Sequence, residues 1–491
     1  MQTNRGAENV RRRAAYLLRS SAIVLALALP QLVRAQSAAM LNDRVRAFVT
    51  VAEPVVALTH VLLIDGTGAA PQADQTVVIR DGKIADVGPS SRVQAPSGAR
   101  VMDLTGHTVI PGIVGVHDHL FYTAAGGRAV QMSFTGPRLY LASGVTTIRT
   151  TGGRSPYAEI NTKALVDSGR VPGPRIHLTA PYLTGGGKGM SGSMAEVTSP
   201  EAARRFVAYW GDEGMKWIKA YTDISRADLG AAIDEAHKRG MKATGHLCSV
   251  SFREAVDLGI DNLEHGMLTM SDFATGKPAD VCPANYLTGV AQADPTGPQA
   301  RSVIQSMIDH KVSMTSTLAV FEPFVPGRLA NDERTWSMMA PDLRTSYLQV
   351  RHQIDSTRTS PFTNDVFHHA MAFEKAFADA GGLLAAGVDP TGNGGALAGF
   401  GDQRNYELLS EAGFTPPQVI RIMSLNGAKV LGVDDRLGSV TAGKIADLVV
   451  LRGDLTANPA VIHEVTTVFK DGVGYDSPKL IAAVKGRVGI D

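Results

Sequence analysis

Residues 108–120 read TVIPGIVGVHDHL, an apolar run that ends in two histidines separated by one residue. The run is short and rich in β-branched residues, which predicts a buried strand over residues 109–116. Because side chains alternate along a strand, His117 and His119 fall on one face and can bind one cation, while Asp118 points away. Two solvated histidines at a strand end would give the same pattern, so the rest of the chain has to decide.

Seven further short apolar segments follow, each succeeded by a helical pattern or by a loop rich in glycine and proline. The eight predicted strands are residues 109–116, 145–150, 175–180, 217–221, 242–246, 262–265, 311–318 and 383–388. Strands that alternate with helices predict parallel βα units, and eight of them predict an α/β fold with a closed (β/α)8 TIM barrel. Helices are expected at residues 225–239, 252–258, 299–309, 367–380 and 416–425, the first with Ser225 as its N-cap.

Short alternating segments also lie near both ends of the chain. They are residues 55–63, 75–80, 83–87 and 100–104 on one side, and 446–451, 461–470 and 473 onward on the other. The two sets predict one small composite β-sandwich domain built from both chain ends. The expected domains are therefore residues 36–110 and 431–491 for the two parts of this β-domain, and 111–430 for the barrel.

The first 35 residues predict a secretory signal peptide. A segment rich in arginine precedes the apolar stretch 22–33, and a small-x-small pattern ends at Ala35, after which cleavage is expected. The apolar stretch is too short to span a membrane, and Pro30 interrupts it, so no stable span is expected after signal removal. We expect a periplasmic or secreted protein. An uncleaved anchor and twin-arginine export through the triplet at 11–13 are alternatives.

The balance of charge excludes some kinds of partner. The chain has 48 Lys and Arg against 47 Asp and Glu, a net charge of +1, so nothing points to nucleic acid or to an anionic membrane surface. Its two cysteines, Cys248 and Cys282, are too few for a disulfide framework. Cys248 is expected to be a buried structural thiol, with a soft-ligand role beside His246 as the alternative.

Side chains suited to metal binding stand where the predicted strands end. They are His117 and His119 after the first strand, Lys219 in WIKAY, His246 in ATGHL, His265 in NLEHG and Asp389 in AGVDP. In a barrel these positions meet at the carboxyl-terminal mouth. Nitrogen and oxygen ligands of this kind suit zinc or a similar divalent metal, so the sequence predicts a metal site there.

With these residues in place, the chain resembles the metal-dependent amidohydrolase superfamily over about residues 50–485. The resemblance is carried by PGIVGVHDHL at 111–120, by the sheet residues 77–87 and by LGSVTAGKIADLVVL at 437–451. Within that superfamily, IKAY, TGH and LEHG resemble the binuclear branch that includes prolidase-like dipeptidases and ochratoxinase-like amidases.

This resemblance implies two divalent metal ions, with zinc as the expected metal, and a Lys219 carboxylated by carbon dioxide that bridges them. Lys216, the rival lysine, lies toward the other end of the strand pattern. The implied ligands are His117, His119 and Asp389 for one metal and His246 and His265 for the other, with Lys219 and a hydroxide shared. A carbamate fits this role because it offers anionic oxygens where an ammonium would repel the cations.

The resemblance also gives Asp389 the role of a proton shuttle between the attacking water and the leaving amine. We expect the Tyr221 hydroxyl to help stabilise the developing oxyanion, with a purely structural tyrosine as the alternative. Lys188, Arg154 and Arg404 are candidates for binding a substrate carboxylate. His177 is a candidate pocket residue, with a core position as the alternative, whereas His368 and His369 are expected to be exposed. The long segments 184–194, 274–300 and 322–364 are candidate pocket walls.

The expected activity is metal-dependent hydrolysis of an amide or peptide bond in a small molecule such as a dipeptide or an N-acyl amino acid. A lactone, a cyclic amide or a phosphotriester is an alternative substrate for the same site. The bridging lysine argues against a deaminase, and a non-catalytic barrel scaffold is disfavoured because no expected ligand is missing. A homo-oligomer is compatible with the sequence.

Overall fold

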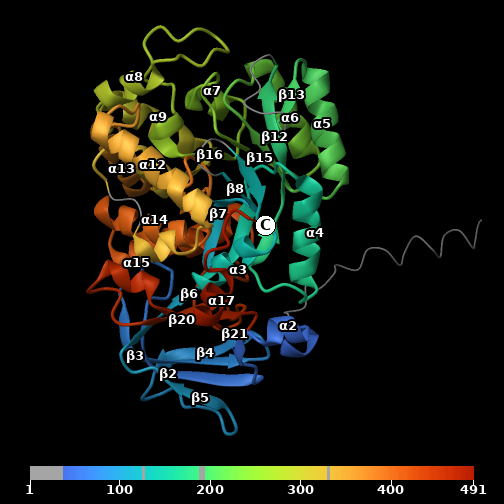
Figure 1. Cartoon of the computed structure of the whole chain (residues 1–491), viewed down its shortest axis with the longest axis vertical. Coiled ribbons are helices and arrows are strands. Elements are labelled where there is room, and N and C mark those ends of the chain that lie inside the picture. Colours follow the sequence, from blue (N-terminus) through green and yellow to red (C-terminus); the bar gives the residue numbers. More distant parts are fainter. Residues whose placement is uncertain (1–36, 124–127, 187–193, 329–331, 491) are drawn as a thin grey trace, which may run out of the picture. The chain divides into compact units, whose positions relative to one another are not determined.

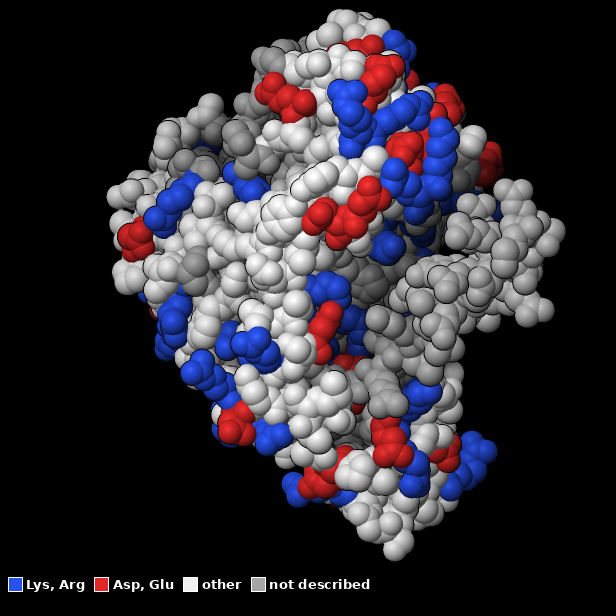
Figure 2. Space-filling model, turned by 90° about the vertical axis from the view of Figure 1, so that its right-hand side faces the viewer, with Lys and Arg blue, Asp and Glu red and all other residues white. Residues whose placement is uncertain are grey.

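The computed structural model describes residues 37–123, 128–186, 194–328 and 332–490. The predicted signal peptide lies outside the described residues. Within those ranges, no helix combines the length and the apolar character needed to cross a lipid bilayer. On the face drawn in Figure 2, basic and acidic side chains are interspersed rather than gathered by sign, as the balanced composition predicts.

Parallel strands occupy the middle of the chain (Figure 1). One sheet has the order β11-β10-β7 and the other β13-β12-β14-β15-β16-β17-β18. The bounds are β7 Ile113–Asp118, β10 Val145–Thr150, β11 Arg175–His177, β12 Thr179–Gly185, β13 Ala195–Val197, β14 Trp217–Ala220, β15 Lys242–Gly245, β16 Asn262–Glu264, β17 Ser313–Ser316 and β18 Leu384–Ala386. A single residue separates β11 from β12, and after β18 the Asp389 amide donates to the His117 carbonyl of β7 at 2.8 Å.

Helices alternate with these strands, so the region has the mixed α/β character that the sequence predicts. The longer ones are α3 Thr135–Ala142, α4 Pro156–Asp167, α5 Pro200–Asp212, α6 Arg226–Lys238, α9 Pro298–Asp309, α12 Pro341–Thr357, α13 Asn364–Asp379, α14 Phe400–Glu411 and α17 Ser477–Val484; shorter ones include α7 Phe252–Asp257, α8 Tyr286–Gln292, α10 Leu318–Phe321, α15 Pro416–Arg421 and α16 Gly427–Leu431. The predicted cap of α6 is confirmed, because the Ser225 hydroxyl accepts a hydrogen bond from the Asp228 amide at 3.1 Å.

A nine-stranded sheet combines strands from both ends of the chain (Figure 1). Its members are β1 Val49–Val51, β2 Val55–Leu63, β3 Gln72–Arg80, β4 Lys83–Pro89, β5 Arg100–Asp103, β6 His107–Pro111, β19 Leu448–Arg452, β20 Val465–Lys470 and β21 Val473–Asp476. Early and late strands meet twice in this sheet, since β1 pairs with β21 and β6 pairs with β19, both antiparallel.

The single strand predicted over residues 109–116 is wrong. The structure divides this run into β6, in the nine-stranded sheet, and β7, in the parallel sheet, with Gly112 between them. A Cβ atom at Gly112 would lie 2.2 Å from Oγ1 of Thr146, so only glycine allows the chain to pass its neighbour at this point. A continuous apolar run hides such a break because both strands are buried.

Two further predictions are corrected. The predicted strand 461–470 starts later, because Pro459–His463 form a 3-10 helix that Asn458 caps through the Ala460 amide. The buried thiol expected at Cys248 is instead half of a disulfide with Cys282, whose Cα atom lies 4.9 Å away. The segment 274–300 returns to the loop after β15, and this pairing across 34 positions leaves no local sign in the sequence.

Candidate metal centre

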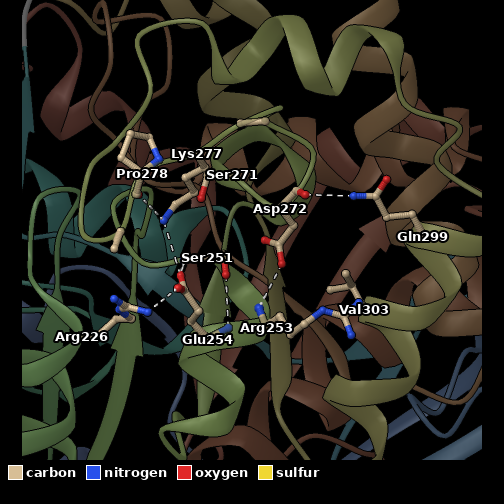
Figure 3. Close-up of a pocket in the computed structure, with 12 residues that line it drawn as sticks. Arg226, Ser251, Arg253, Glu254, Ser271, Asp272, Lys277, Pro278, Gln299 and Val303 are labelled. Atoms are coloured by element: carbon tan, nitrogen blue, oxygen red, sulfur yellow. Dashed lines mark hydrogen bonds and ion pairs between the residues drawn. The ribbon is translucent and has the colours of Figure 1, made fainter.

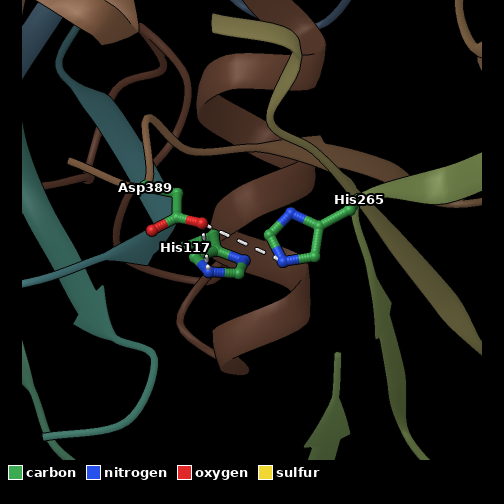
Figure 4. A group of neighbouring side chains, drawn as sticks. All are labelled: His117, His265 and Asp389. Carbon is green, nitrogen blue, oxygen red and sulfur yellow. Dashed lines mark ion pairs between the residues drawn. The ribbon is translucent and has the colours of Figure 1, made fainter. Parts of the chain in front are cut away.

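The Asp389 carboxylate, which follows β18, is the point on which three histidines converge. Its Oδ1 lies 3.2 Å from Nε2 of His119, and its Oδ2 lies 3.5 Å from Nε2 of His117 and 3.9 Å from Nε2 of His265. All four side chains are buried. Figure 4 shows His117 and His265 directed at the same carboxylate from different strands. His117 of β7 and His119, which directly follows this strand, thus meet at one site, as the sequence predicts.

His117 is oriented by Glu264, the last residue of β16. The Nδ1 atom of His117 lies 2.7 Å from Oε2 of Glu264. Burial by itself raises the pKa of this carboxyl, but Lys219 and Arg149 hold it below its usual value. Glu264 is therefore an anion that accepts the Nδ1 proton, and the lone pair on Nε2 of His117 faces Asp389.

A cation bound between these groups would explain their arrangement. Burial lowers the pKa of His117 and of His265 well below the usual value, so both rings are neutral. Neutral rings give the Asp389 carboxylate no positive partner, and the lone pair on Nε2 of His117 faces its anionic oxygen at 3.5 Å. Donor atoms of His117, His265 and Asp389 lie within 4.8 Å of one another. This donor set fits a divalent cation.

Lys219 of β14 is fully enclosed beside this centre. Its Nζ has no hydrogen-bond partner within the described residues and lies 4.0 Å from Oε1 of Glu264. Burial lowers the pKa of Lys219 to about 8, because an ammonium loses its hydration there. Lys216, at the other end of the strand, is exposed. Of the two lysines, only Lys219 reaches the cavity.

His246 and Tyr221 stand at the ends of β15 and β14. The ring centroid of His246 lies 4.5 Å from that of His265 and 4.7 Å from that of Tyr221. Burial lowers the pKa of His246 to about 3, so this ring is also neutral. Tyr182 of β12 packs edge-on against Tyr221, and its hydroxyl lies 3.3 Å from Nε2 of His119.

These side chains line one cavity of about 470 Å³. Its lining includes His117, His119, Lys219, Tyr221, His246 and Asp389, together with Phe121, Arg154, Tyr182, Met194, Val320, Phe321, Phe324 and Phe362. His265 lies directly behind, in contact with His117 and His246. The structure thus brings the six predicted metal ligands and Tyr221 together, although their residues lie far apart in the chain.

The structure places the other candidate site residues in different surroundings. Arg154 lines the cavity, as expected for a residue that binds a substrate carboxylate. The same prediction for Arg404 is wrong, because this residue belongs to α14 and pairs with Glu322 and Glu407. His177 does not line the cavity, and burial lowers its pKa to about 3. His368 is exposed, but half-buried His369 faces the Val290 carbonyl at 3.0 Å. Lys188 lies outside the described residues.

A second cavity, of about 420 Å³, lies beside α6, α7 and α9 (Figure 3). The segment 274–300 lines this cavity rather than the one at Asp389. Its charged groups are matched to one another: Arg226 pairs with Glu254 and Asp280, and Lys277 also pairs with Glu254. Asp272 accepts hydrogen bonds from the first two amides of α7. These contacts hold the segment in place.

Sequence reasoning missed the groups beneath the histidines. Glu264 is in contact with Arg149 at 2.6 Å and with the Thr244 hydroxyl, and Asn262 accepts from Arg149 at 3.0 Å. Glu264 was visible in NLEHG, immediately before His265. Glu264 and Arg149 are each a charged residue at the end of a buried strand, and this pattern could have indicated that they have a charged partner.

The family comparison concerns the last part of the chain, whose residues 328–474 match the Amidohydrolase family. The chain is similar to an enamidase of Eubacterium barkeri, with 29% identity over 187 residues, which is 36% of this chain and 44% of that protein. The match thus spans less than half of that relative.

Solved structures resemble a larger share of the chain. A putative prolidase from Bifidobacterium longum has 24% identity and a TM-score of 0.61 over 88% of this chain and 98% of that one. The A. niger ochratoxinase has 17% identity and a TM-score of 0.60 over 86% and 95%. At these identities, the likeness is one of fold.

Proposed function

We propose that the chain is an amidohydrolase, a metal-dependent hydrolase that cleaves the amide bond of a dipeptide or an N-acyl amino acid. The match of residues 328–474 to the Amidohydrolase family supports hydrolysis of a carbon–nitrogen bond. One observation carries the proposal: three histidine Nε2 atoms converge on the Asp389 carboxylate, beside a buried lysine whose Nζ forms no hydrogen bond with the described residues.

We assign His117, His119 and Asp389 to one divalent metal and His246 and His265 to the second, with Lys219 shared and zinc as the expected ion. Glu264 supports this assignment because it fixes the proton of His117 on Nδ1 and leaves Nε2 free to bind. The Thr317 hydroxyl lies 2.6 Å from Nδ1 of His265, just as Glu264 lies beside Nδ1 of His117. When bound, the two cations would lower the pKa of a shared water and polarise the scissile carbonyl.

The carbamate on Lys219 is proposed because of this lysine's surroundings. A buried ammonium next to cations would be repelled, whereas reaction of the neutral amine with carbon dioxide gives an anion with two oxygen donors and releases a proton. No hydrogen bond from a described residue holds the Nζ atom, so it is free to react. In the sheet, Lys219 is paired with Tyr182 of β12 on one side and Thr244 of β15 on the other, and its side chain lines the same cavity.

Asp389 is the proposed proton shuttle. It borders the cavity, and its Oδ1 accepts a hydrogen bond from the Thr391 hydroxyl at 2.7 Å. The carboxylate would accept the proton of the attacking water and return it to the nitrogen of the leaving amine, which completes hydrolysis. Tyr221 also lines the cavity, and burial raises its pKa, so its hydroxyl keeps a proton with which to support the developing oxyanion.

The wider architecture is part of the proposal. We interpret the parallel strands as a closed (β/α)8 barrel over residues 111–430, because all of them except the edge strand β13 follow in chain order and the Asp389 amide links the last to the first. Residues 36–110 and 431–491 would form the composite β-domain. The predicted signal peptide and the Cys248–Cys282 disulfide both favour a periplasmic or secreted location.

Metal content and a substrate panel test this proposal. Protein purified with bicarbonate should contain two divalent ions per chain and hydrolyse dipeptides or N-acyl amino acids. Less than one metal per chain, unchanged by Lys219→Ala, would contradict the binuclear centre. If the protein turned over only lactones, only phosphotriesters or only cyclic amides, that class would be its substrate instead. Metal binding without turnover of any compound would favour a non-catalytic scaffold.

A further inference from the structure

The cavity at Asp389 has a basic flank beside His119. Arg154 lies in the loop between β10 and α4, and its guanidinium carbon is 5.3 Å from the ring centroid of Phe121. The Phe121 ring in turn lies 4.6 Å from that of His119. Among the described residues, none forms a hydrogen bond with the buried Nε of Arg154 or an ion pair with this arginine. An unpaired guanidinium at the rim of a cavity is suited to a carboxylate of the ligand.

The opposite flank, beside His265, is aromatic. The ring centroid of Phe321, from α10, lies 5.3 Å from that of His265. Phe362 follows at 5.1 Å from Phe321 and 5.6 Å from Phe324. These three rings and Val320 line the cavity together. Such a surface gains free energy when it removes an apolar group from water.

From these two flanks we infer that the preferred substrates are N-acyl amino acids with an aromatic or large apolar acyl group, whose carboxylate binds Arg154. The inference rests on the proposed amide hydrolysis, because it places the scissile bond at Asp389, between His119 and His265. In an N-acyl amino acid, the carboxylate lies on the amine side of this bond and the acyl group on the carbonyl side. One molecule can therefore occupy both flanks at once.

A dipeptide fits this cavity less well, because it carries an ammonium on the carbon next to the scissile carbonyl. Among the described lining residues, Asp389 is the one carboxylate, and it already faces the histidines. Glu322, next to Phe321 in the chain, is buried and paired with Arg328 and Arg404. The segments 124–127, 187–193 and 329–331 contain no Asp or Glu in their sequence. A dipeptide ammonium would therefore lose its hydration without gaining a counter-charge of its own.

Three compounds that differ at single groups test the inference. N-(3-phenylpropanoyl)-L-leucine is L-phenylalanyl-L-leucine without its ammonium, and N-(3-phenylpropanoyl)-L-leucinamide lacks the carboxylate charge. With the metal-loaded enzyme, kcat/KM for the first should exceed that for the dipeptide by about tenfold or more, and that for the amide by about a hundredfold. These comparisons use the unaltered protein, so they do not depend on how any variant folds.

Variants then assign each flank. Arg154→Met should lower kcat/KM for N-(3-phenylpropanoyl)-L-leucine by about a hundredfold and leave the leucinamide unchanged, while Arg154→Lys retains part of the activity. Arg204→Met removes a half-buried arginine of α5, which pairs with Asp234, as a matched control and should have no effect. Phe362→Ala should lower the value by about tenfold for the phenylpropanoyl compound but not for N-acetyl-L-leucine.

The outcomes separate this inference from the proposed function. Equal or faster hydrolysis of the dipeptide, equal rates for acid and amide, or equal losses of both on Arg154→Met would overturn the inference and leave amide hydrolysis intact. If the metal-loaded enzyme cleaved none of the amides, the proposed function itself would be wrong.

Discussion

The two cavities differ in how their charged groups are satisfied. Beside α6 and α7, Arg226 and Lys277 each have carboxylate partners from the protein. At the ends of the parallel strands, Arg154 has no carboxylate partner among the described residues, and Nζ of Lys219 forms no hydrogen bond there and lies 4.0 Å from Oε1 of Glu264, its nearest carboxylate, although both side chains border a cavity. Leaving a buried polar atom unpaired costs about 1–3 kcal/mol, so a fold retains such groups where a ligand supplies the partner. The contrast distinguishes a binding centre from a structural polar cluster.

Exchange of one lysine in each cavity should give the largest difference. Lys219→Ala should lower kcat by about a thousandfold or more and reduce the metal content, because it removes the proposed bridge between the metals. Lys277→Ala, the matched change in the second cavity, should leave both within about twofold, since its partners are protein groups. Metal analysis and steady-state kinetics of the two variants measure this. Similar losses in both would remove the distinction between the cavities.

A carboxylate beside each cavity gives the next comparison. Glu264→Gln removes the anion that orients His117 and pairs with Arg149, so metal affinity should fall about 10–100-fold and stability by about 3 kcal/mol. Asp280→Asn breaks the exposed pair with Arg226 and should cost less than about 1 kcal/mol. Competition with a fluorescent chelator and urea denaturation report the two quantities. A Glu264→Gln protein with unaltered metal affinity would show that His117 needs no such support.

The disulfide links the surroundings of both cavities, because Cys248 follows His246 and Cys282 lies in the segment that lines the second cavity. Replacing both cysteines with serine should lower the stability by about 3 kcal/mol through the entropy of the open loop in the unfolded chain. Denaturation midpoints with and without reductant measure this loss. The double variant serves as the control, because reductant should not change its denaturation midpoint. If reductant left the midpoint of the wild-type protein unchanged, the disulfide would not stabilise the fold.

A buried acid outside both linings gives the smallest effect. Burial raises the pKa of Glu374 to about 8. The folded protein thus keeps a proton that the unfolded chain loses above its ordinary value of 4.5, so this residue's stabilising contribution falls as pH rises from there toward 8. Glu374→Gln should flatten that decline and raise the stability at pH 9 by about 1 kcal/mol. Thermal unfolding between pH 5 and 9 tests the sign; a variant that loses stability more steeply than wild type would contradict it.

Local patterns in the sequence were enough for much of the fold and the site. Strand β10 and the capped helix α6 were predicted to within a residue, because alternation, β-branched residues and an N-cap serine are local signals. The metal-binding candidates were found by the same means, since a parallel strand brings its carboxyl end to the shared edge.

Features that depend on distant contacts escaped the sequence. The break at Gly112 depends on Thr146, and the disulfide depends on how residues 274–300 return. Glu264 was overlooked because a single glutamate before a histidine does not reveal the Arg149 beneath it. Arg404 was misjudged because its helix position, rather than its charge, decides which carboxylate it meets.

The pairing of β1 with β21 and of β6 with β19 constrains when the protein can become native. Residues near position 50 must wait for partners near position 475, more than four hundred residues later in synthesis. Until then the early strands expose backbone edges that can pair with other chains, a hazard for a nascent polypeptide. A chaperone that shields these edges until translation ends would raise the yield of native enzyme, and expression at low temperature should do the same.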